Sequence, residues 1–415
     1  MKMKTSGPVF AIFLGALAAL PPISIDMALP ALTNIASDLG APYGLAGLTL
    51  SLFMLGFAVS PFFYGPLADR HGRRPLLSIG LCLFAVGGLA ASATPSIGLL
   101  LAARLVQGAG AGAGMTLAMA MVRDLFEGRA AQSRLAVITV VANVAPILAP
   151  SLGAALLKWI GWRGIYGATA ACGLVLLALV RFTVSETAAV RAEPKPSLAG
   201  TVLRDYREVL NHRGTMAHIV VNALGFGWMF AYVSGSPLLL IDRLHASPAL
   251  YAALFACTGG GIVGGAAISG RLVHRGIPSR HLLFLAVLLA VAATGSLSAL
   301  SFAGWVSIAT FMPLLILSTA AFGMAAPCAA HGALDPLPQL AGIAGGLLTS
   351  IQMLAGAVAS VVVAMLFPSM GTLAMTGTMA GFAIAALLVM SGITRVTHTS
   401  SPAQAEASVS ALTER

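Results

Sequence analysis

Long apolar runs that follow one another along nearly the whole chain are the feature that most limits how this sequence can fold. Each run has about the 20 residues that an α-helix needs to cross the hydrocarbon core of a bilayer. Of the 415 residues, 58% are hydrophobic and only 9% are charged, and the mean hydropathy is +0.93. Water-soluble domains do not have this composition. The sequence therefore predicts an all-α membrane protein with twelve transmembrane helices, over residues 8–29, 44–64, 75–94, 96–118, 133–156, 162–182, 215–241, 249–270, 280–300, 304–328, 341–366 and 371–393.

The first apolar run has a competing interpretation as a secretory signal peptide. Lys2 and Lys4 precede it, and small residues near Ala18 resemble a cleavage site. The run continues past Ala18 to Asp26, however, and many further apolar runs follow it. We therefore expect an uncleaved first transmembrane helix.

Positive charges indicate which ends of the expected spans face the cytoplasm, because Lys and Arg are retained on that side. With a cytoplasmic N-terminus, 19 of the 23 Lys and Arg residues fall in cytoplasmic segments, and three, Lys158, Arg163 and Arg243, fall in outer ones. We therefore expect both termini in the cytoplasm. The same distribution explains the net charge of +10. A nucleic-acid partner would need one contiguous basic face, so we expect none.

The longest polar interruption divides the chain into two halves of six spans each. The segment Gly65–Arg70 after the second span is echoed by Gly270–Arg275 after the eighth, which suggests an internal duplication. Parallel halves of this kind hold a substrate site between them near the membrane midplane. We expect an N-terminal six-helix bundle at residues 1–182, a cytoplasmic linker at 183–214, a C-terminal six-helix bundle at 215–394 and a disordered cytoplasmic tail at 395–415.

The segment between the second and third spans carries a family resemblance. It reads Gly65-Pro66-Leu67-Ala68-Asp69-Arg70-His71-Gly72-Arg73-Arg74-Pro75, and it resembles the signature loop of the major facilitator superfamily. Its glycines permit close backbone approach and a sharp turn, and Asp69 can bond Arg70, Arg73 or a helix end. An ordinary positive-inside loop would not require Gly, Asp and Gly at these positions. The resemblance implies the major facilitator fold, with a cytoplasmic gating loop of Gly65, Asp69, Arg70, Gly72, Arg73 and Arg74.

Three further stretches are similar to the twelve-span drug:proton antiporters, and in particular to their bicyclomycin and chloramphenicol resistance-like (Bcr/CflA) subfamily. They are residues 26–32, 145–153 and 231–237. The resemblance implies a place in the bacterial inner (cytoplasmic) membrane and an antiporter motif of Pro146, Pro150 and Gly153. Two prolines four residues apart lie on one helix face and loosen the helix. A bent helix without a coupling role is the alternative.

Ionisable side chains inside transmembrane spans are costly and usually functional. Asp26 is the one acid, and Arg104 the one base, that lie clearly within the expected spans. We expect Asp26 to carry the transported proton, with Arg104 as its electrostatic partner. Two alternatives remain open: Asp26 caps a helix break, or Arg104 ties backbone carbonyls together. His218 and His331 are the next candidates for a proton relay, or are simply hydrogen-bonded histidines.

Methionine and aromatic side chains on the spans suit a cavity that accepts varied apolar ligands, because they adapt to different shapes. Gln107 shares a helix face with Arg104 at a spacing of three residues. The predicted cavity residues are Asp26, Met27, Gln107, Met115, Asn143, Asn222, Phe226, Tyr232, Ser236 and Gln352. Contact with lipid or with neighbouring helices is the alternative for each Met and aromatic residue.

We interpret the chain as a proton-coupled secondary active exporter, an antiporter, of small hydrophobic or amphipathic compounds such as drugs, which works by rocker-switch alternating access. A proton-coupled uptake symporter or facilitator of a small metabolite with the same fold is the alternative. The sequence shows no paired nucleophile and base and no phosphate-binding loop, so we expect neither enzyme activity nor a bound nucleotide or other cofactor. Its four cysteines lack metal-ligand spacing, and we expect them to be small core residues without a metal. The expected partners are a small-molecule substrate, protons and the lipid bilayer, and we expect a monomer.

Overall fold

The computed structural model describes residues 7–187 and 198–399, and its regular elements are helices. The first part of the chain forms α1 (Pro8–Asp26), the short η1 (Leu29–Ala31), α2 (Leu32–Asp38), α3 (Tyr43–His71), α4 (Arg73–Ser92), α5 (Ile97–Leu125) and α6 (Gly128–Phe182). The second part forms α7 (Leu198–Asn211), α8 (Arg213–Pro237), the π-helical η2 (Leu238–Arg243), α9 (Pro248–His274), α10 (Ser279–Phe302), α11 (Ile308–Leu334), η3 (Pro338–Leu340), α12 (Ala341–Met370) and α13 (Thr372–Thr399).

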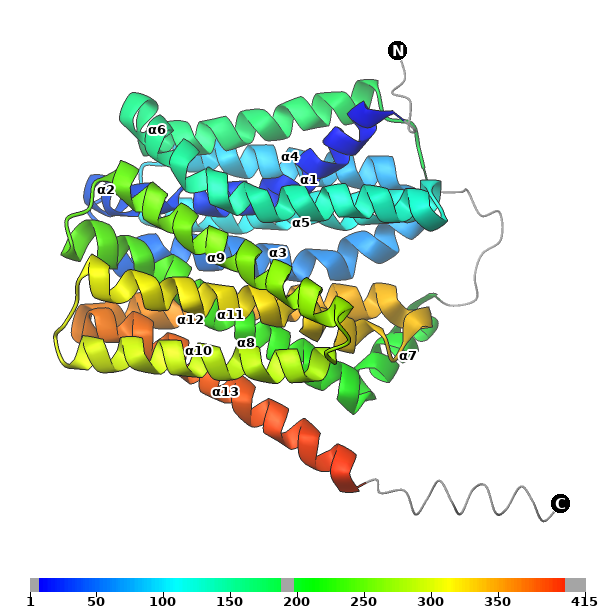
Figure 1. Ribbon diagram of the computed structural model, residues 1–415. Helices are drawn as coiled ribbons and strands as arrows, with labels where there is room; N and C mark the ends of the chain where they lie inside the picture. Colours follow the sequence, from blue (N-terminus) through cyan, green and yellow to red (C-terminus); the bar gives the residue numbers. More distant parts are fainter. Residues whose placement is uncertain (1–6, 188–197, 400–415) are drawn as a thin grey trace.

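The element α6 consists of two membrane-spanning helices joined by a sharp turn. Gly161 has a φ of 67°, which glycine adopts at little cost, and the chain reverses its direction there (Figure 1). Within the described residues, 11 helices are long and apolar enough to cross a membrane, and α6, with 55 residues, is counted among them once. Divided at Gly161, α6 supplies the fifth and sixth spans, and the predicted twelve-helix fold is confirmed.

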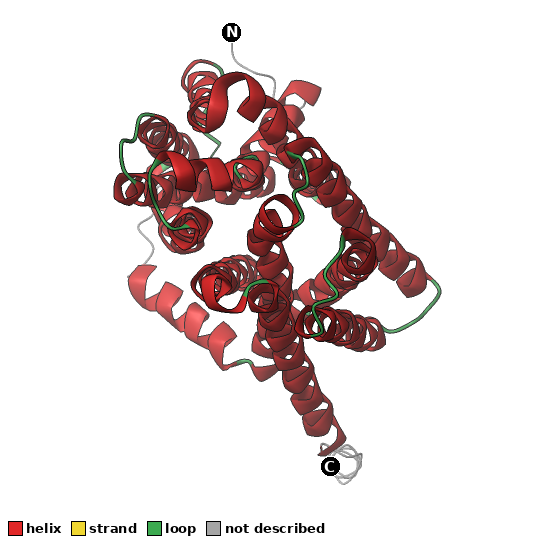
Figure 2. Ribbon diagram, turned by 90° about the vertical axis from the view of Figure 1, so that its left-hand side faces the viewer, coloured by secondary structure: helices red, strands yellow, loops and turns green. Residues whose placement is uncertain are grey.

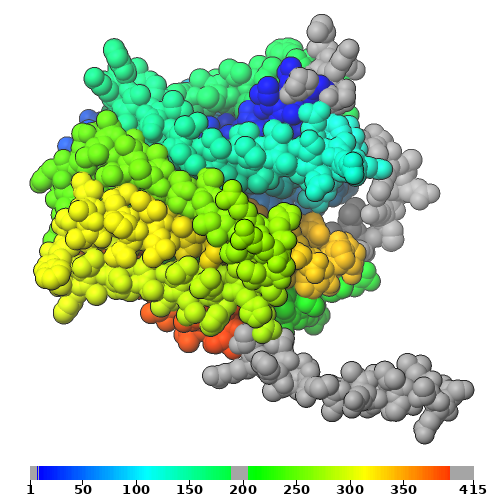
Figure 3. Space-filling model, in the orientation of Figure 1, coloured from blue at the N-terminus to red at the C-terminus, as the bar shows by residue number. Residues whose placement is uncertain are grey.

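The helices pack as two groups. In the first group α1, α3, α4, α5 and α6 pack together, and in the second group α8 to α13 do the same. The groups meet where α3 packs on α12 and α6 packs on α9. Figure 1 shows one group above the other, and in Figure 2 most helices are seen nearly end-on. The space-filling view shows α9 lying along the boundary between the groups (Figure 3).

Glycines allow the helices of the first group to approach closely. A Cβ atom added at Gly108 of α5 would overlap with the carbonyl group of Phe53 on α3, and one added at Gly110 would overlap with the backbone of Phe84 on α4. Both phenylalanines are fully buried. Membrane helices associate through such packing because lipid is as apolar as their side chains.

The two ends of the bundle are named here by the expected orientation. The end at which α1 begins and α7 lies is the one that the Lys and Arg distribution predicts to be cytoplasmic, and we call it the inner end. It lies on the right of Figure 1, and the opposite, outer end carries α2 on the left.

The segment from Gly65 to Arg74 is mostly helical, whereas a loop was expected. Helix α3 continues to His71 and α4 begins at Arg73. Gly72 alone separates them, and its φ of 94° makes the predicted sharp turn. Gly65 lies inside α3, and nothing lies within 4 Å of a Cβ atom added there. The expected close approach at Gly65 is therefore wrong.

The linker and the tail contain more helix than expected. Residues 198–211 form α7, whose Val209 is buried against Ile219 and Leu347. Helix α13 extends to Thr399, beyond the start of the tail expected at residue 395. Residues 188–197 of the linker and 400–415 of the tail lie outside the described residues.

The cysteines are not all core residues. Cys328 is buried, but Cys82, Cys172 and Cys257 are exposed on the surface of the bundle. In a bilayer this surface faces lipid, where a small apolar thiol is as well accommodated as in a core.

Candidate substrate cavity

A cavity of about 410 Å³ lies between the two groups of helices. The first group contributes side chains from α1, α3, α5 and α6, and the second group contributes side chains from α8, α9, α11 and α12. Most of these side chains are apolar or aromatic, as in pockets that bind small organic molecules.

Six of the ten predicted cavity residues line this cavity, namely Asp26, Met115, Asn143, Phe226, Tyr232 and Gln352. The other four do not. Asn222 lies outside the cavity lining, and its side chain donates a 2.8 Å hydrogen bond to Oε1 of Gln352. Gln107 is buried and donates a 3.1 Å hydrogen bond to Thr169. Met27 and Ser236 are also buried outside the lining.

Among the residues that the structure describes, Asp26 is the only carboxylate that lines the cavity. It is the last residue of α1, directly before the chain turns into η1, and it is 5% exposed. No ion pair within 4 Å involves Asp26 in the described part of the chain. An acid in these surroundings is available to a proton or to a cationic ligand.

Arg104 is fully buried and bonded to its neighbours on three helices. Its Nη2 donates a 3.0 Å hydrogen bond to the carbonyl oxygen of Ser24 on α1, and its Nε donates one of 3.4 Å to the carbonyl oxygen of Thr49 on α3. Its Nη1 donates a 2.6 Å hydrogen bond to Oε1 of Gln107 on α5. The guanidinium carbon also lies 4.3 Å from the centroid of the Phe53 ring.

The expected ion pair between Asp26 and Arg104 is therefore not formed among the described residues. The N–H groups of Arg104 instead donate to Ser24, Thr49 and Gln107. Arg104 ties backbone carbonyls together, which is the alternative that the sequence left open. It supports the last turn of α1, and so it acts on Asp26 through the main chain.

The second group supplies an aromatic wall, of which the sequence analysis predicted Phe226 but not Phe230, Phe255 or Phe322. The rings of Phe226 and Phe230 stack with centroids 5.1 Å apart, and Phe322 lies 6.1 Å from Phe226. All three line the cavity together with Phe255. The spacing of four residues between Phe226 and Phe230 places both on one face of α8. This spacing is the sequence feature from which the second ring could have been predicted.

The expected antiporter motif reaches the segment that carries Asp26. Pro146 lines the cavity, and Pro150 is buried in α6. A Cβ atom added at Gly153 would overlap with the carbonyl group of Met27, the residue after Asp26. Glycine at this position therefore permits α6 to pack directly on the end of α1.

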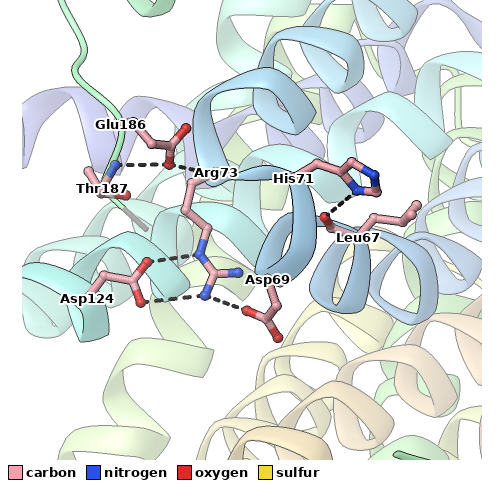
Figure 4. Close-up of polar contacts among 7 residues, drawn as sticks. All are labelled: Leu67, Asp69, His71, Arg73, Asp124, Glu186 and Thr187. Carbon is pink, nitrogen blue, oxygen red and sulfur yellow. Dashed lines mark hydrogen bonds and ion pairs between the residues drawn. The ribbon is translucent and has the colours of Figure 1, made fainter. Parts of the chain in front are cut away.

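Arg73 is the centre of a charged cluster at the inner end (Figure 4). Its Nη2 lies 2.6 Å from Oδ1 of Asp69, and its Nε lies 2.9 Å from Oδ2 of Asp124. The Glu186 carboxylate accepts hydrogen bonds from the backbone N–H groups of Arg73 and Arg74, at 2.8 and 3.1 Å. Glu186 therefore caps the N-terminus of α4. The expected contact of Asp69 with Arg73 is present, whereas the roles of Asp124 and Glu186 were missed.

The two histidines considered for a proton relay lie away from the cavity. His218 on α8 is half-buried, and its Nδ1 is 2.8 Å from the carbonyl oxygen of Gly214. His331 is exposed in the last turn of α11. Neither is among the residues that line the cavity.

The cavity is closed at the outer end. The short η1 contacts α8 and α9 there, and a Cβ atom added at Gly44 of α3 would lie 2.8 Å from the carbonyl oxygen of Ala364 on α12. Farther toward the inner end, Thr139 and Asn143 line the cavity and are exposed.

Comparison with known proteins shows which family has this architecture. A family model described as the Major Facilitator Superfamily matches residues 12–360. The uncharacterized MFS-type transporter YdgK of Bacillus subtilis (strain 168) is 32% identical over 355 residues, which are 84% of this chain and 87% of that protein. The multidrug resistance protein MdtL of Escherichia coli (strain K12) is 32% identical over 247 residues, which are 59% of this chain and 61% of MdtL.

Solved structures share the fold at low sequence identity. A D-xylose-proton symporter has a TM-score of 0.72 at 16% identity, covering 92% of this chain and 97% of that chain. A bacterial homolog of the human lysosomal transporter Spinster, in an inward-facing and occupied conformation, has a TM-score of 0.73 at 15% identity, covering 95% and 98%. Likeness at this identity shows the fold alone.

Proposed function

We propose that this chain, which belongs to the Major Facilitator Superfamily and is therefore a multi-pass membrane transporter and not an enzyme, is a proton-coupled exporter. The proposed cargo is a small hydrophobic or amphipathic compound, and Asp26 is the proposed proton carrier. The observation that carries the proposal is the position of Asp26, a buried carboxylate on the wall of a largely apolar cavity between the two groups of helices. Proton and cationic cargo would compete for this carboxylate, and such competition is the basis of exchange.

The lining of the cavity supports an amphipathic cargo. Phe226, Phe230 and Phe322 offer aromatic faces, and Met115 and Met353 offer flexible apolar ones. The amide of Gln352 is fixed by Asn222 and adds one hydrogen-bonding group. A soft wall with few polar groups accepts different shapes, because its side chains can repack.

Alternating access would follow from rocking of the two groups. We assign residues 1–182 and 215–394 as the moving bundles, 183–214 as the cytoplasmic linker and 395–415 as a cytoplasmic tail. The bundles meet along α3 and α12 and along α6 and α9, so both seams would change during the cycle. The Lys and Arg distribution supports cytoplasmic termini in a bacterial inner membrane, and the relatives named above support a bacterial setting.

The energy of one proton is sufficient for export. One charge that crosses about 100 mV yields about 2.3 kcal/mol, and one pH unit adds about 1.4 kcal/mol. A total of about 3.7 kcal/mol per proton sustains a concentration ratio of several hundred. Export therefore requires no nucleotide.

The assignment to drug:proton antiporters, and to the bicyclomycin and chloramphenicol resistance-like subfamily, is part of this proposal. It is supported by residues 26–32, 145–153 and 231–237 and by the packing of Gly153 on Met27. The similarity of 247 residues to the multidrug resistance protein MdtL also supports this assignment.

The test uses everted membrane vesicles that contain the full chain, energised to be acidic inside. Addition of a cargo drawn from a panel of cationic antibiotics, dyes and neutral metabolites should release protons from the vesicle interior and accumulate the cargo inside. Asp26→Asn should do neither. Cargo that instead leaves the vesicles together with protons would establish uptake symport and overturn the export proposal.

A further inference from the structure

Three hydroxyl side chains of the second group form a connected cluster on the wall of the cavity. Tyr232 on α8, Thr258 on α9 and Thr319 on α11 all line the cavity, and none of them is more than 2% exposed. The Tyr232 hydroxyl lies 3.0 Å from Oγ1 of Thr258, and Oγ1 of Thr319 lies 2.9 Å from the carbonyl oxygen of Thr258. We call these three residues the hydroxyl cluster. Three helices thus bring oxygen atoms to one part of a largely apolar wall.

The hydrogens of the hydroxyl cluster are all used on other groups of the protein. Oγ1 of Thr258 lies 2.7 Å from the carbonyl oxygen of Phe255, which can only accept. A threonine hydroxyl has one hydrogen, so Thr258 donates to Phe255 and accepts from Tyr232. The Thr319 hydroxyl donates to the carbonyl oxygen of Thr258 or, at 3.0 Å, to that of Ile316. The cluster can therefore offer a ligand lone pairs but no hydrogen.

The other polar side chains of the lining add acceptors and few donors. Asp26 is an acceptor when it is ionised, and the Thr139 hydroxyl donates its hydrogen to the carbonyl oxygen of Leu135 at 2.9 Å. Hydrogens remain on the side-chain amides of Asn143 and Gln352. No Lys, Arg or His lines the cavity in the part of the chain that the structure describes. This lining suits a cation that carries hydrogens and disfavours an anion.

The hydroxyl cluster and the Gln352 amide lie at different depths of the cavity. Gln352 accepts the hydrogen bond of Asn222 on α8, and α8 also carries Tyr232. At a rise of about 1.5 Å per residue, Asn222 and Tyr232 are about 15 Å apart along the helix. Helix α8 follows α7 and begins at the inner end, so the cluster lies on the outer side. The stacked rings of Phe226 and Phe230 lie between the two levels.

We propose that the cavity selects a protonated amine that carries N–H groups, with its head on the hydroxyl cluster and its apolar body against Phe226 and Phe230. The N–H groups match the lone pairs of the cluster, and the charge matches Asp26 on the same cavity wall. Hydrogen bonds from a charged donor are about twice as strong as those between neutral groups. A quaternary ammonium group has the charge but no N–H, and a neutral amide has an N–H but no charge, so each satisfies only part of the wall.

This inference rests on the proposed function and narrows its cargo. A small hydrophobic or amphipathic compound becomes an amphipathic amine, and Thr258 and Thr319 become specificity-determining residues. Because the selection lies in the binding step, it can be measured separately from proton coupling.

The test measures binding to the purified full chain, without a proton gradient. Three probes share one aromatic body: naphthylmethylamine, its trimethylammonium derivative and its N-acetyl derivative. Calorimetric titrations are done near about pH 8, where an aliphatic amine is charged. The amine should bind at least about tenfold more tightly than either derivative, which is the factor expected from one hydrogen bond to a charged group.

Two variants remove acceptors of the cluster. Thr319→Val keeps a side chain of similar shape and removes Oγ1, so it should weaken binding of the amine by about tenfold and leave that of the trimethylammonium derivative unchanged. Thr258→Val also removes an acceptor and frees the hydrogen of Tyr232. It should weaken amine binding and strengthen binding of the N-acetyl derivative, whose carbonyl oxygen can accept that hydrogen. This second variant provides the test if Thr319→Val does not fold.

Thr294→Val on α10 is the matched control. The Thr294 hydroxyl is also buried and donates to a carbonyl oxygen, that of Ala290 at 2.7 Å, but Thr294 is not among the residues that line the cavity. This variant should bind all three probes as the wild type does.

The outcomes separate this inference from the proposed function. Absent amine binding, equal wild-type affinity for the two cations, or an equal loss of affinity for both cations in the cluster variants would overturn the inference. Unchanged amine affinity in the cluster variants would overturn it as well. Selective amine binding by a protein that does not exchange cargo for protons would contradict only the proposed function. Proton-driven export without any preference for the amine would contradict only this inference.

Discussion

The guanidinium group of Arg104 is hydrogen-bonded to the carbonyl oxygen of Ser24 at 3.0 Å, two residues before Asp26 on the same helix. The buried base thus holds the main chain beside the buried acid, and no ion pair joins the two in the described part of the chain. Asp26 keeps its carboxylate free for the cavity, while Arg104 fixes where that carboxylate stands. The positive charge of Arg104 interacts with carbonyl dipoles and with the face of the Phe53 ring.

Arg104→Ala should destabilise the protein before it alters coupling. The change leaves the buried carbonyl groups of Ser24 and Thr49 without their donor, and an unpaired buried acceptor costs about 1–3 kcal/mol. Melting in detergent should therefore occur several degrees lower. Arg163→Ala removes a half-exposed arginine that pairs with Asp38, and it should shift melting much less, since surface ion pairs contribute little. Equal shifts in the two variants would refute the role of Arg104 as a tie.

Asp69→Asn should slow transport and leave membrane insertion and substrate binding largely intact. Asp69 pairs with Arg73 at 2.6 Å, and Arg73 also holds Asp124 on α5, so the change loosens the junction of α3, α4 and α5. Asp205→Asn, which affects a loose 3.7 Å contact with Arg204 on α7, is the matched control. Normal turnover of purified, reconstituted Asp69→Asn would show that the cluster is only architectural.

Gly153→Ala should impair coupling while Gly264→Ala should not. The added methyl group at Gly153 would overlap with the carbonyl group of Met27 and displace α6 from the end of α1, whereas nothing lies within 4 Å of a Cβ atom at Gly264. We expect Gly153→Ala and Pro150→Leu to insert into the membrane but to leak protons or to lose cargo accumulation. Export at the wild-type stoichiometry in both variants would remove the motif from the mechanism.

The fold was accessible from the sequence because a bilayer restricts backbone structure. Every buried N–H and C=O group must be satisfied within its own segment, so long apolar runs must be helices. The same reasoning could not place helix ends at the membrane surface. There α3 and α4 extend to either side of Gly72, and α7 forms in the linker.

The site was accessible only in part. Asp26 stands out in the sequence because a buried acid in a span is rare, and it does line the cavity. The hydrogen-bond partners of Arg104 could not be predicted from the sequence. Backbone carbonyl groups compete with carboxylates for its N–H donors, and every residue has such a carbonyl group. Gln107 and Ser236 lie on the same helix faces as cavity residues, but neither lines the cavity. The side chain of Gln107 is hydrogen-bonded to Thr169, and that of Ser236 is hydrogen-bonded to Tyr251.

The central claim is that Asp26 carries the proton that drives export, and one measurement tests it most directly. Wild type and Asp26→Asn are reconstituted at equal density, and cargo accumulation is followed after an imposed pH difference. We predict that the wild type concentrates its cargo against the gradient, and that Asp26→Asn binds or equilibrates cargo but does not concentrate it. Uphill accumulation by Asp26→Asn in response to the pH difference would contradict the claim and direct attention to His218 and His331.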